Sequence, residues 1–236
     1  MMKQARIWMS DELLRSGCAK KAAWWNNYMK GEIPFIGVGI PEIRQTFLDR
    51  ESAFAEMPMN RQVALVNGLM RGRYAEEKLA AILYIQLFWL DRVKHGFLLG
   101  LLTDWFDDRH IHDWNTTDWL AVRILAPLVD SGDEKVIWKL KRWNRDGYLW
   151  KARASLVPFA RARSITSHGK VIDRFADTLI RRDERFAKTA VGWVLREYSK
   201  HDHHFVLDFL SRHVKHTTAE VKRNALKYYR QGGIKS

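Results

Sequence analysis

Apolar residues recur at helical spacing along most of the chain, and no convincing run alternates apolar with polar positions. The clearest stripe lies between residues 76 and 91 and consists of Leu79, Ile82, Leu83, Leu87 and Leu90. Spacings of three and four residues place these side chains on one face of a helix. Similar stripes follow at residues 118–128, 136–143, 172–179, 190–198 and 205–210. The pattern therefore predicts an all-α protein.

Turn signals separate the predicted helices at short intervals. The clearest loop covers residues 31–41 and contains Pro34, Gly37, Gly39 and Pro41. Asp133 and Asp202 each precede an apolar stripe, so both are predicted to cap the N-terminus of a helix. Pro127 and Pro158 lie inside helical patterns, where a proline lacks the backbone donor, and kinks are expected there.

Helices as amphipathic as these must stack to bury their apolar faces. A helical bundle is one solution, and a solenoid of antiparallel helix pairs with HEAT-like repeats of roughly 40 residues is the other. We predict the second, a right-handed superhelix that forms a single domain over residues 1–236. Its concave face would be long enough to hold a DNA duplex.

The charge of the chain points to a polyanionic partner. Lys and Arg total 40 against 27 Asp and Glu, which gives a formal net charge of +13. Such an excess suits DNA, RNA or an anionic membrane surface, while the plainer alternative is a protein kept soluble by its charge. No membrane span is expected, because the longest apolar stretch, residues 79–90, contains Gln86 and is too short.

Cysteine usage and the start of the chain bear on the compartment. The single cysteine, Cys18, permits neither an intramolecular disulfide nor a thiolate zinc site. The first residues include Lys3, Arg6, Asp11 and Glu12, so no signal peptide is expected. We predict a cytoplasmic protein.

One segment interleaves basic and aromatic residues. Between residues 135 and 163 the cations are Lys135, Lys139, Lys141, Arg142, Arg145, Lys151, Arg153, Arg161 and Arg163, and only Asp146 opposes them. The same segment contains Trp138, Trp143, Tyr148 and Trp150. A nucleic-acid surface needs cations for phosphate and flat rings for sugar or base. The alternative is that the rings belong to the core and the cations to a solvated face.

Trp114 and Asp118 form the pair with the clearest chemical potential. They stand four residues apart, so a helix would place an indole and a carboxylate side by side. Together they would attract a cation. The alternative is a buried tryptophan beside a helix-capping aspartate. His201, Asp202, His203 and His204 fit a solvated helix start better than a metal site, so no metal or cofactor is predicted.

Four parts of the sequence resemble motifs of the AlkD-like DNA glycosylases. The N-terminal signature of that family is similar to Tyr28-Met29-Lys30-Gly31, Phe35-Ile36-Gly37-Val38 and Pro41-Glu42-Ile43-Arg44. Its Trp-x-x-x-Asp element is matched by Trp114 to Asp118, and its Trp-x-x-Arg-Ala element by Trp150-Lys151-Ala152-Arg153-Ala154. The C-terminal motif resembles Gly192-Trp193-Val194-Leu195-Arg196-Glu197-Tyr198. Order and separations agree from about Tyr28 to Tyr198.

The resemblance implies a DNA repair enzyme of HEAT-like repeats that removes N3- and N7-alkylated purines from duplex DNA. It implies that Asp118 is the catalytic carboxylate and that Trp114 and Trp193 line the damaged nucleotide. Arg153 would lie near a phosphate and Tyr28 near the lesion, and with them Arg44, Lys151 and Arg196 are predicted to bind DNA. The resemblance implies neither a metal nor a cofactor, and we expect a monomer.

The sequence departs from the family pattern at a few positions, and two other functions stay open. Asn115 stands where many relatives have Asp, Asp113 where some have an aromatic residue, and Gly39 and Ile40 where some have polar residues. We expect these changes to affect substrate range and DNA affinity more than the reaction. A non-catalytic protein that binds branched or distorted DNA is the main alternative, and a HEAT-like protein scaffold is the other.

Overall fold

The computed structural model describes residues 2–229, with side chains from Ala5 onward. Every regular element in this range is helical, which confirms the predicted all-α fold of helical repeats. The chain divides into two compact units. The first contains the described part of residues 1–94 together with residues 101–119, and the second contains residues 95–100 and the described part of 120–236. That the whole chain forms one domain stays a prediction.

The first unit is built from the helices of the N-terminal half of the chain. They are α1 (Met2–Arg15), α2 (Ala19–Tyr28), α3 (Ile40–Leu48), α4 (Glu51–Ala55), α5 (Met59–Met70), α6 (Ala75–Phe88), most of α7 (His95–Asp107) and most of α8 (Trp114–Leu120). The loop predicted at residues 31–41 ends two residues earlier in the structure, at Gly39. Helix α3 begins at Ile40, and Pro41 occupies its first turn, where a missing N–H costs nothing.

Helix α6 forms the centre of the first unit. It packs against α1, α3 and α5, and residues on every side of it are buried. Phe47 of α3 and Phe54 of α4 meet edge to face beside Tyr84, whose hydroxyl donates to the Phe54 carbonyl at 2.8 Å. A helix that is apolar all round suits such a central place.

The second unit continues the chain as helix pairs. Its elements are the π-helical turn η1 (Ala121–Leu125), α9 (Ala126–Asp130), α10 (Glu134–Asn144), α11 (Leu149–Leu156), the 3₁₀ turns η2 (Val157–Ala160) and η3 (Ile165–His168), α12 (Gly169–Ile180), α13 (Arg185–Tyr198), α14 (His203–Arg212) and α15 (Ala219–Ala225). Asp133 and Asp202 accept hydrogen bonds from the backbone N–H groups of Lys135 and Phe205, so both predicted N-caps are confirmed.

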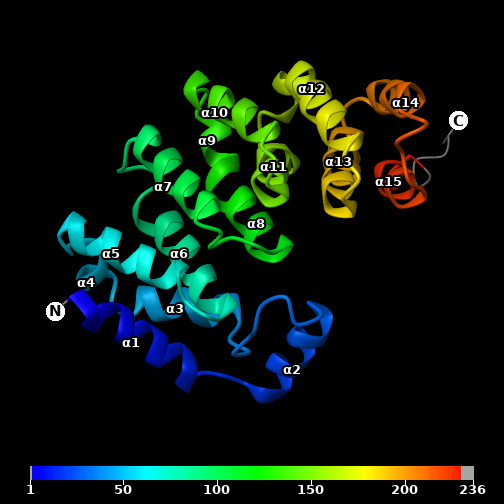
Figure 1. The fold of residues 1–236 in the computed structure, drawn as a ribbon. Coiled ribbons are helices and arrows are strands. Elements are labelled where there is room, and N and C mark those ends of the chain that lie inside the picture. The colour runs from blue at the N-terminus through cyan, green and yellow to red at the C-terminus, as the bar shows by residue number, and fades with distance from the viewer. Residues whose placement is uncertain (1, 230–236) are drawn as a thin grey trace, which may run out of the picture. The chain divides into compact units, whose positions relative to one another are not determined.

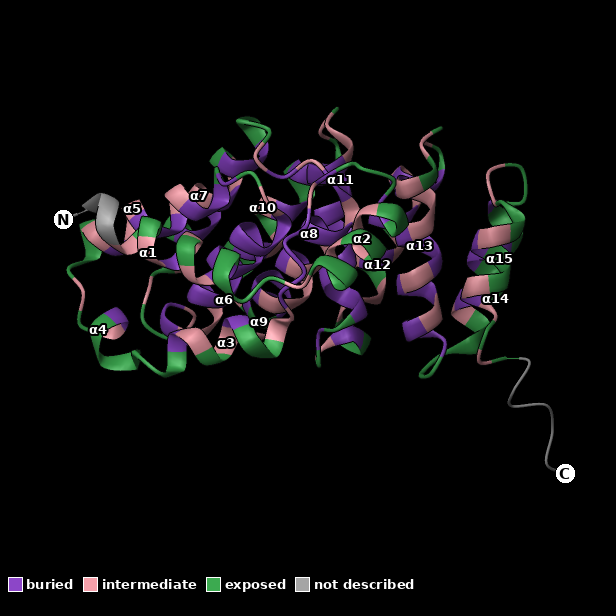
Figure 2. Cartoon of the chain, turned by 90° about the horizontal axis from the view of Figure 1, so that it is seen from below, coloured by how far each residue is buried: buried purple, intermediate pink, exposed green. Residues whose placement is uncertain are grey.

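These pairs give the second unit two layers. Helix α10 packs on α11 and α12 packs on α13, while α10 also contacts α12 and α11 contacts α13. Figure 1 shows α10, α12 and α14 following one another on one side, with α11, α13 and α15 on the other. Helix α13, between its neighbours, contains more buried residues than the terminal helix α15 (Figure 2).

Both interior prolines coincide with a change of helix type. Pro127 follows the π-helical turn, in which the Ala126 N–H donates to the Ala121 carbonyl, and Pro158 lies in the 3₁₀ turn η2. A proline cannot supply the regular N–H, so the helix changes its winding there. Within the described residues, no helix combines the length and the apolar character that crossing a bilayer requires.

Candidate functional site

Helix α8 is held at its start by Asp113. The Asp113 carboxylate accepts the backbone N–H of Thr116 at 2.8 Å, and the Thr117 hydroxyl donates to the Asp113 carbonyl at 2.6 Å. Asp113 and Thr116 are fully buried. This cap places Trp114 in the first turn and Asp118 one turn later, both half-buried on one side of the helix. The capping aspartate is therefore Asp113 and not Asp118.

A buried lysine lies beneath this cap. Lys78, on the first turn of α6, is 3% exposed and donates to the Met70 carbonyl at 2.6 Å. Burial lowers the pKa of the Lys78 ammonium, while the negative charges of Asp113 and Glu77 oppose this change. One oxygen of Asp113 accepts no hydrogen bond within the described residues, so Lys78 balances its charge through space.

Trp114 belongs to a group of aromatic rings in the first unit. Its ring meets Tyr28 edge to face, with centroids 5.8 Å apart. It also packs against a small core formed by Met29, Ile33, Phe35 and Ala75. Trp114 and Tyr28, predicted on separate motifs to lie at the site, are thus in contact.

The loop that carries Phe35 is fixed by one buried carboxylate. Glu76 of α6 accepts the backbone N–H groups of Ile36, Gly37 and Val38, at 3.0, 2.7 and 3.3 Å. Gly37 has φ +91°, and a Cβ there would stand 2.2 Å from the Cys18 carbonyl oxygen. Only glycine fits this position without strain, which gives the second motif of the N-terminal signature a structural reason.

In the second unit, Arg153 ties α11 to α13. Its guanidinium donates to the Phe186 carbonyl at 2.6 Å and to the Thr189 hydroxyl at 3.2 Å, and the residue is only 4% exposed. Thr189 stands one turn before Trp193 on the same side of α13. Trp193 is half-buried, and its buried indole N–H has no hydrogen-bond partner within the described residues.

Gly192, beside Trp193, lets α13 approach α15 closely. A Cβ at Gly192 would stand 3.3 Å from the backbone of Val221, which is tighter than ordinary packing. The glycine of the C-terminal motif therefore serves the packing of α13 on α15.

The other predicted DNA-binding cations have partners inside the protein. Lys151 is 6% exposed and pairs with Asp146 at 3.0 Å. Arg196 donates to Glu197 at 2.7 Å and to Asn224 at 3.2 Å, and Arg44 donates to Gln86 at 3.2 Å. A phosphate at these residues would compete with the internal partners, and their DNA-binding role stays a prediction.

Glu197 is the anchor of the Arg196 side chain. Burial alone would raise the pKa of its carboxyl, but hydrogen bonds from Lys200 and Arg196 outweigh burial and lower that pKa below its ordinary value. Sequence reasoning identified the motif but could not find these partners.

The structure brings some predicted site residues together. Tyr28, Trp114 and Asp118 lie in the first unit, and Arg153 and Trp193 lie in the second. Within each unit the residues are linked by direct contacts or by neighbouring turns of one helix. Convergence of the two sets stays a prediction.

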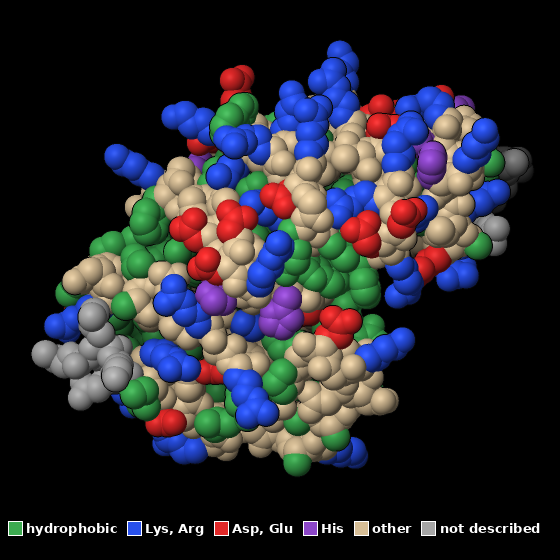
Figure 3. Space-filling view, in the orientation of Figure 1, with side chains coloured by type: hydrophobic (Ala, Val, Ile, Leu, Met, Phe, Trp, Pro, Cys, Tyr) green, Lys and Arg blue, Asp and Glu red, His purple; other side chains and the backbone are tan. Residues whose placement is uncertain are grey.

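The basic and aromatic segment divides between two environments. Lys135, Lys141 and Arg142 are exposed on α10 and Arg145 is exposed just after it, where Figure 3 shows Lys and Arg side chains gathered. Trp143 and Trp150 are buried. Trp143 and Trp150 therefore fit the core interpretation, and the binding of nucleic acid by the exposed cations stays a prediction. Within residues 2–229 no cluster of three or more His, Cys, Asp or Glu could hold a metal ion.

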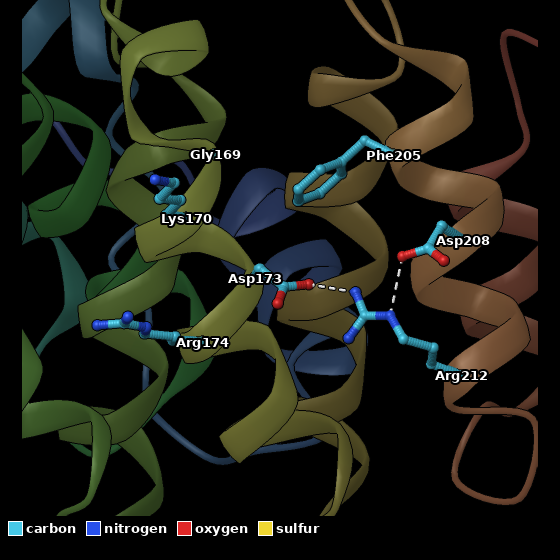
Figure 4. Close-up of a pocket in the computed structure, with 7 residues that line it drawn as sticks. All are labelled: Gly169, Lys170, Asp173, Arg174, Phe205, Asp208 and Arg212. Carbon is cyan, nitrogen blue, oxygen red and sulfur yellow. Dashed lines mark hydrogen bonds and ion pairs between the residues drawn. The ribbon is translucent and has the colours of Figure 1, made fainter.

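An open groove of about 520 Å³ lies between α12 and α14 (Figure 4), and its lining contains none of the predicted site residues. Arg212 spans it and pairs with Asp173 at 2.5 Å and with Asp208 at 2.8 Å. Phe205 stands at one end, and Lys170 and Arg174 project from α12. Since its carboxylates are engaged by Arg212, this groove offers no evident catalytic group.

Comparison with known proteins gives matches of two kinds. The family model described as "DNA alkylation repair enzyme" matches residues 9–229. A solved structure described as a "predicted DNA alkylation repair enzyme from Enterococcus faecalis" is similar with a TM-score of 0.78 at 17% identity, over 90% of this chain and 96% of that chain. At this identity the likeness shows the fold. No curated protein matches the chain.

Proposed function

The chain belongs to the family of DNA alkylation repair enzymes, and from this premise we propose that it is an alkylpurine DNA glycosylase. It hydrolyses the N-glycosidic bond of cationic N3- or N7-alkylated purines in duplex DNA. The observation that carries the proposal is the pair on α8. Trp114 and Asp118 stand one turn apart, both partly accessible, with the Tyr28 ring against Trp114.

The chemistry follows from the charge of the lesion. An alkylated purine already carries a formal positive charge, so the C1′–N bond breaks with its electron pair going to the base, which becomes neutral. The positive charge then develops on the sugar. The Asp118 carboxylate stabilises this charge and takes a proton from the water whose oxygen bonds to C1′.

The tryptophans add to the electrostatic stabilisation of the positive charge on the sugar. An indole face attracts positive charge, and Trp114 is held beside Asp118 by the helix itself. Trp193 supplies a second ring in the proposal. Arg153, which binds the turn of α13 before Trp193, then positions that ring in addition to any phosphate it contacts.

The test measures release of 7-methylguanine and 3-methyladenine from methylated duplex DNA in single turnover. Asp118→Asn keeps the size of the side chain but removes its charge, and we expect the rate constant to fall at least about 100-fold. Asp113→Asn is the matched control, with the same chemical change on the adjacent turn. It removes the charge that balances Lys78, so it lowers the unfolding free energy by about 1–3 kcal/mol while the folded protein still excises.

Equal excision by the wild type and Asp118→Asn would refute the catalytic role. A folded wild type that binds duplex DNA but releases no base would refute the glycosylase and favour the non-catalytic DNA-binding function.

A further inference from the structure

A second groove lies between α10 and α12, two helices of one layer of the second unit (Figure 1). Its volume is about 260 Å³, below the roughly 300–1,000 Å³ of sites that enclose a small molecule. The groove therefore suits one or two side chains of a larger partner. Its lining consists of Ile137, Lys141, Asn144 and Arg145 on the side of α10, and of Val171, Arg174, Phe175 and Thr178 on α12.

The floor of this groove is mainly apolar. Phe175 is 4% exposed, and Ile137 and Val171, one from each helix, are half-buried. The buried amide of Asn144 donates to the Ser155 hydroxyl at 3.0 Å and to the Phe175 carbonyl at 3.2 Å. Both amide protons are thus engaged inside the protein, so the floor offers a partner apolar contact.

Three cations form the rim of the groove. Lys141, Arg145 and Arg174 are exposed, and none of them forms an ion pair within the described residues. The lining that the structure describes contains no acidic side chain. Three uncompensated positive charges around an apolar floor attract an anionic group and raise its local concentration.

The neighbouring groove between α12 and α14 differs in its charge. There Asp173 and Asp208 engage the guanidinium of Arg212. In Figure 4 the Arg174 side chain points away from Arg212 and from both carboxylates, and the same side chain lines the groove beside α10. Arg174 therefore adds its charge to the side of α12 that faces α10.

An exposed tryptophan stands beside the groove on α10. Trp138 follows Ile137 in the sequence and is 58% exposed, and the Arg142 guanidinium lies over its ring, 5.0 Å from the centroid. Large apolar side chains left in water mark interaction sites, and Trp and Arg are enriched among the residues that contribute most to protein interfaces. Adjacent positions of a helix lie about 100° apart, so the groove and Trp138 form one continuous surface.

We propose that this surface binds an acidic peptide segment of a partner protein. An apolar side chain of the segment enters the groove against Ile137 and Phe175, and its carboxylates pair with the cations of the rim. A second copy of this chain is a poor partner, because each copy has a net charge of +13. A DNA duplex offers phosphates to the rim but no side chain to the apolar floor. No residue of the proposed glycosylase site lines the groove, so the two proposals are independent.

The test measures binding of fluorescein-labelled peptides by anisotropy. The first probe has twelve residues of Asp, Glu and Ser with two Leu at its centre, and the second has Ser in place of both Leu. The second probe keeps the charges of the first but lacks its apolar side chains. Wild-type protein should therefore bind the first probe at least about tenfold more tightly.

Charge variants test the rim. Lys141→Ala/Arg145→Ala should weaken binding of the Leu probe about tenfold, because two charge pairs are lost. Lys222→Ala/Arg223→Ala is the matched control, since it removes the same two kinds of charge from exposed positions of α15. It should change the affinity less than about twofold.

Variants of apolar residues test the floor and the tryptophan. Ile137→Lys adds a cation but removes part of the apolar floor, so it should weaken binding of the Leu probe about fivefold. Trp138→Ala should weaken it about fivefold as well. Trp24→Ala is the control, because Trp24 is also 58% exposed but lies on α2, which contains no buried residue; it should leave the affinity unchanged. Melting temperatures establish that every variant is folded.

Equal affinity of the wild type for the two probes, or tighter binding by Ile137→Lys, would overturn the proposal, since charge alone would then account for the contact. Failure of the folded wild type to bind the Leu probe would overturn it too. A twenty-residue single strand of deoxythymidine is the competing probe. If that strand binds through Lys141 and Arg145 while neither peptide binds, the surface is a nucleic-acid site and the peptide proposal is wrong.

Discussion

Burial separates the roles of Asp113 and Asp118. Asp113 is fully buried, caps α8 and faces the buried ammonium of Lys78. Asp118 stands just over one turn further along and is partly accessible. The first carboxylate therefore serves folding, whereas the partial accessibility of the second is compatible with the catalytic role that we propose for it.

Gly37 offers a test of the loop next to Tyr28. We expect Gly37→Ala to lower the unfolding free energy by about 2–4 kcal/mol, because a left-handed φ and a backbone clash act together. Gly31→Ala is the control, since Gly31 has φ +73° but open space around it. It should cost only about 1 kcal/mol. Urea denaturation measures both, and equal costs would show that the clash at Gly37 is relieved.

At the scale of elements, α6 shows the limit of periodicity as a guide. The predicted stripe contained Leu87 and Leu90, which are half-exposed, and omitted Ile85 and Phe88, which are buried. An apolar stripe implies that the opposite face of the helix is exposed to solvent. Helix α6 is instead covered on all sides by α1, α3, α5 and the loop that is hydrogen-bonded to Glu76. Its existence was predictable from local sequence, whereas its central place depends on long-range packing.

The candidate site was predictable to a similar degree. The spacing of Trp114 and Asp118 and the order of the motifs identified residues that the structure places on α8, α11 and α13. The partners of the cations were not predictable. Asn224, which binds Arg196, lies 28 residues further along the chain, and only the packing of α13 on α15 brings it near.

The contact between α12 and α14 should make the unfolding free energy of the protein fall at acid pH. Burial lowers the pKa of the His213 imidazole, Arg181 and Arg212 lower it further, and Asp177 and Asp173 oppose them. The unfolded chain then binds the proton first. The unfolding free energy should therefore fall as the pH drops below about 6.5 and level off below the lowered pKa. Burial lowers the pKa values of His110 and His168 as well.

Thermal melts between pH 8 and 5 measure this effect. His213→Leu should flatten the dependence in part, because the buried group no longer titrates. His204→Gln, at the exposed start of the same helix, controls for the loss of an imidazole. A dependence in His213→Leu as steep as in the wild type would assign the acid sensitivity to other groups.

At the scale of the whole molecule, the cations behind the net charge of +13 lie in more than one environment. Part of it lies exposed on α10, in the layer of the second unit opposite α11 and α13. Part of it, such as Arg153 and Lys151, is buried against internal partners. A high positive charge alone therefore does not locate the DNA.

The salt dependence of duplex binding can locate it. Each phosphate contact contributes about −0.9 to the slope of log K against log salt. We expect the double variant Arg44→Ala/Arg196→Ala to make the slope less steep by about 1.8, because both residues are predicted to bind DNA. Lys141→Ala/Arg145→Ala should leave it unchanged. The opposite result would place the duplex on the α10 layer.

The absence of buried residues in α2 has a consequence for evolution. New activities usually arise through substitutions that cost stability, and this cost limits which of them a protein can accept. Changes to the exposed Trp24 of α2 carry little such cost, since the core of the first unit lies elsewhere, around α6. Natural selection or laboratory evolution can therefore vary the surface that α2 presents while the scaffold that carries α8 stays the same.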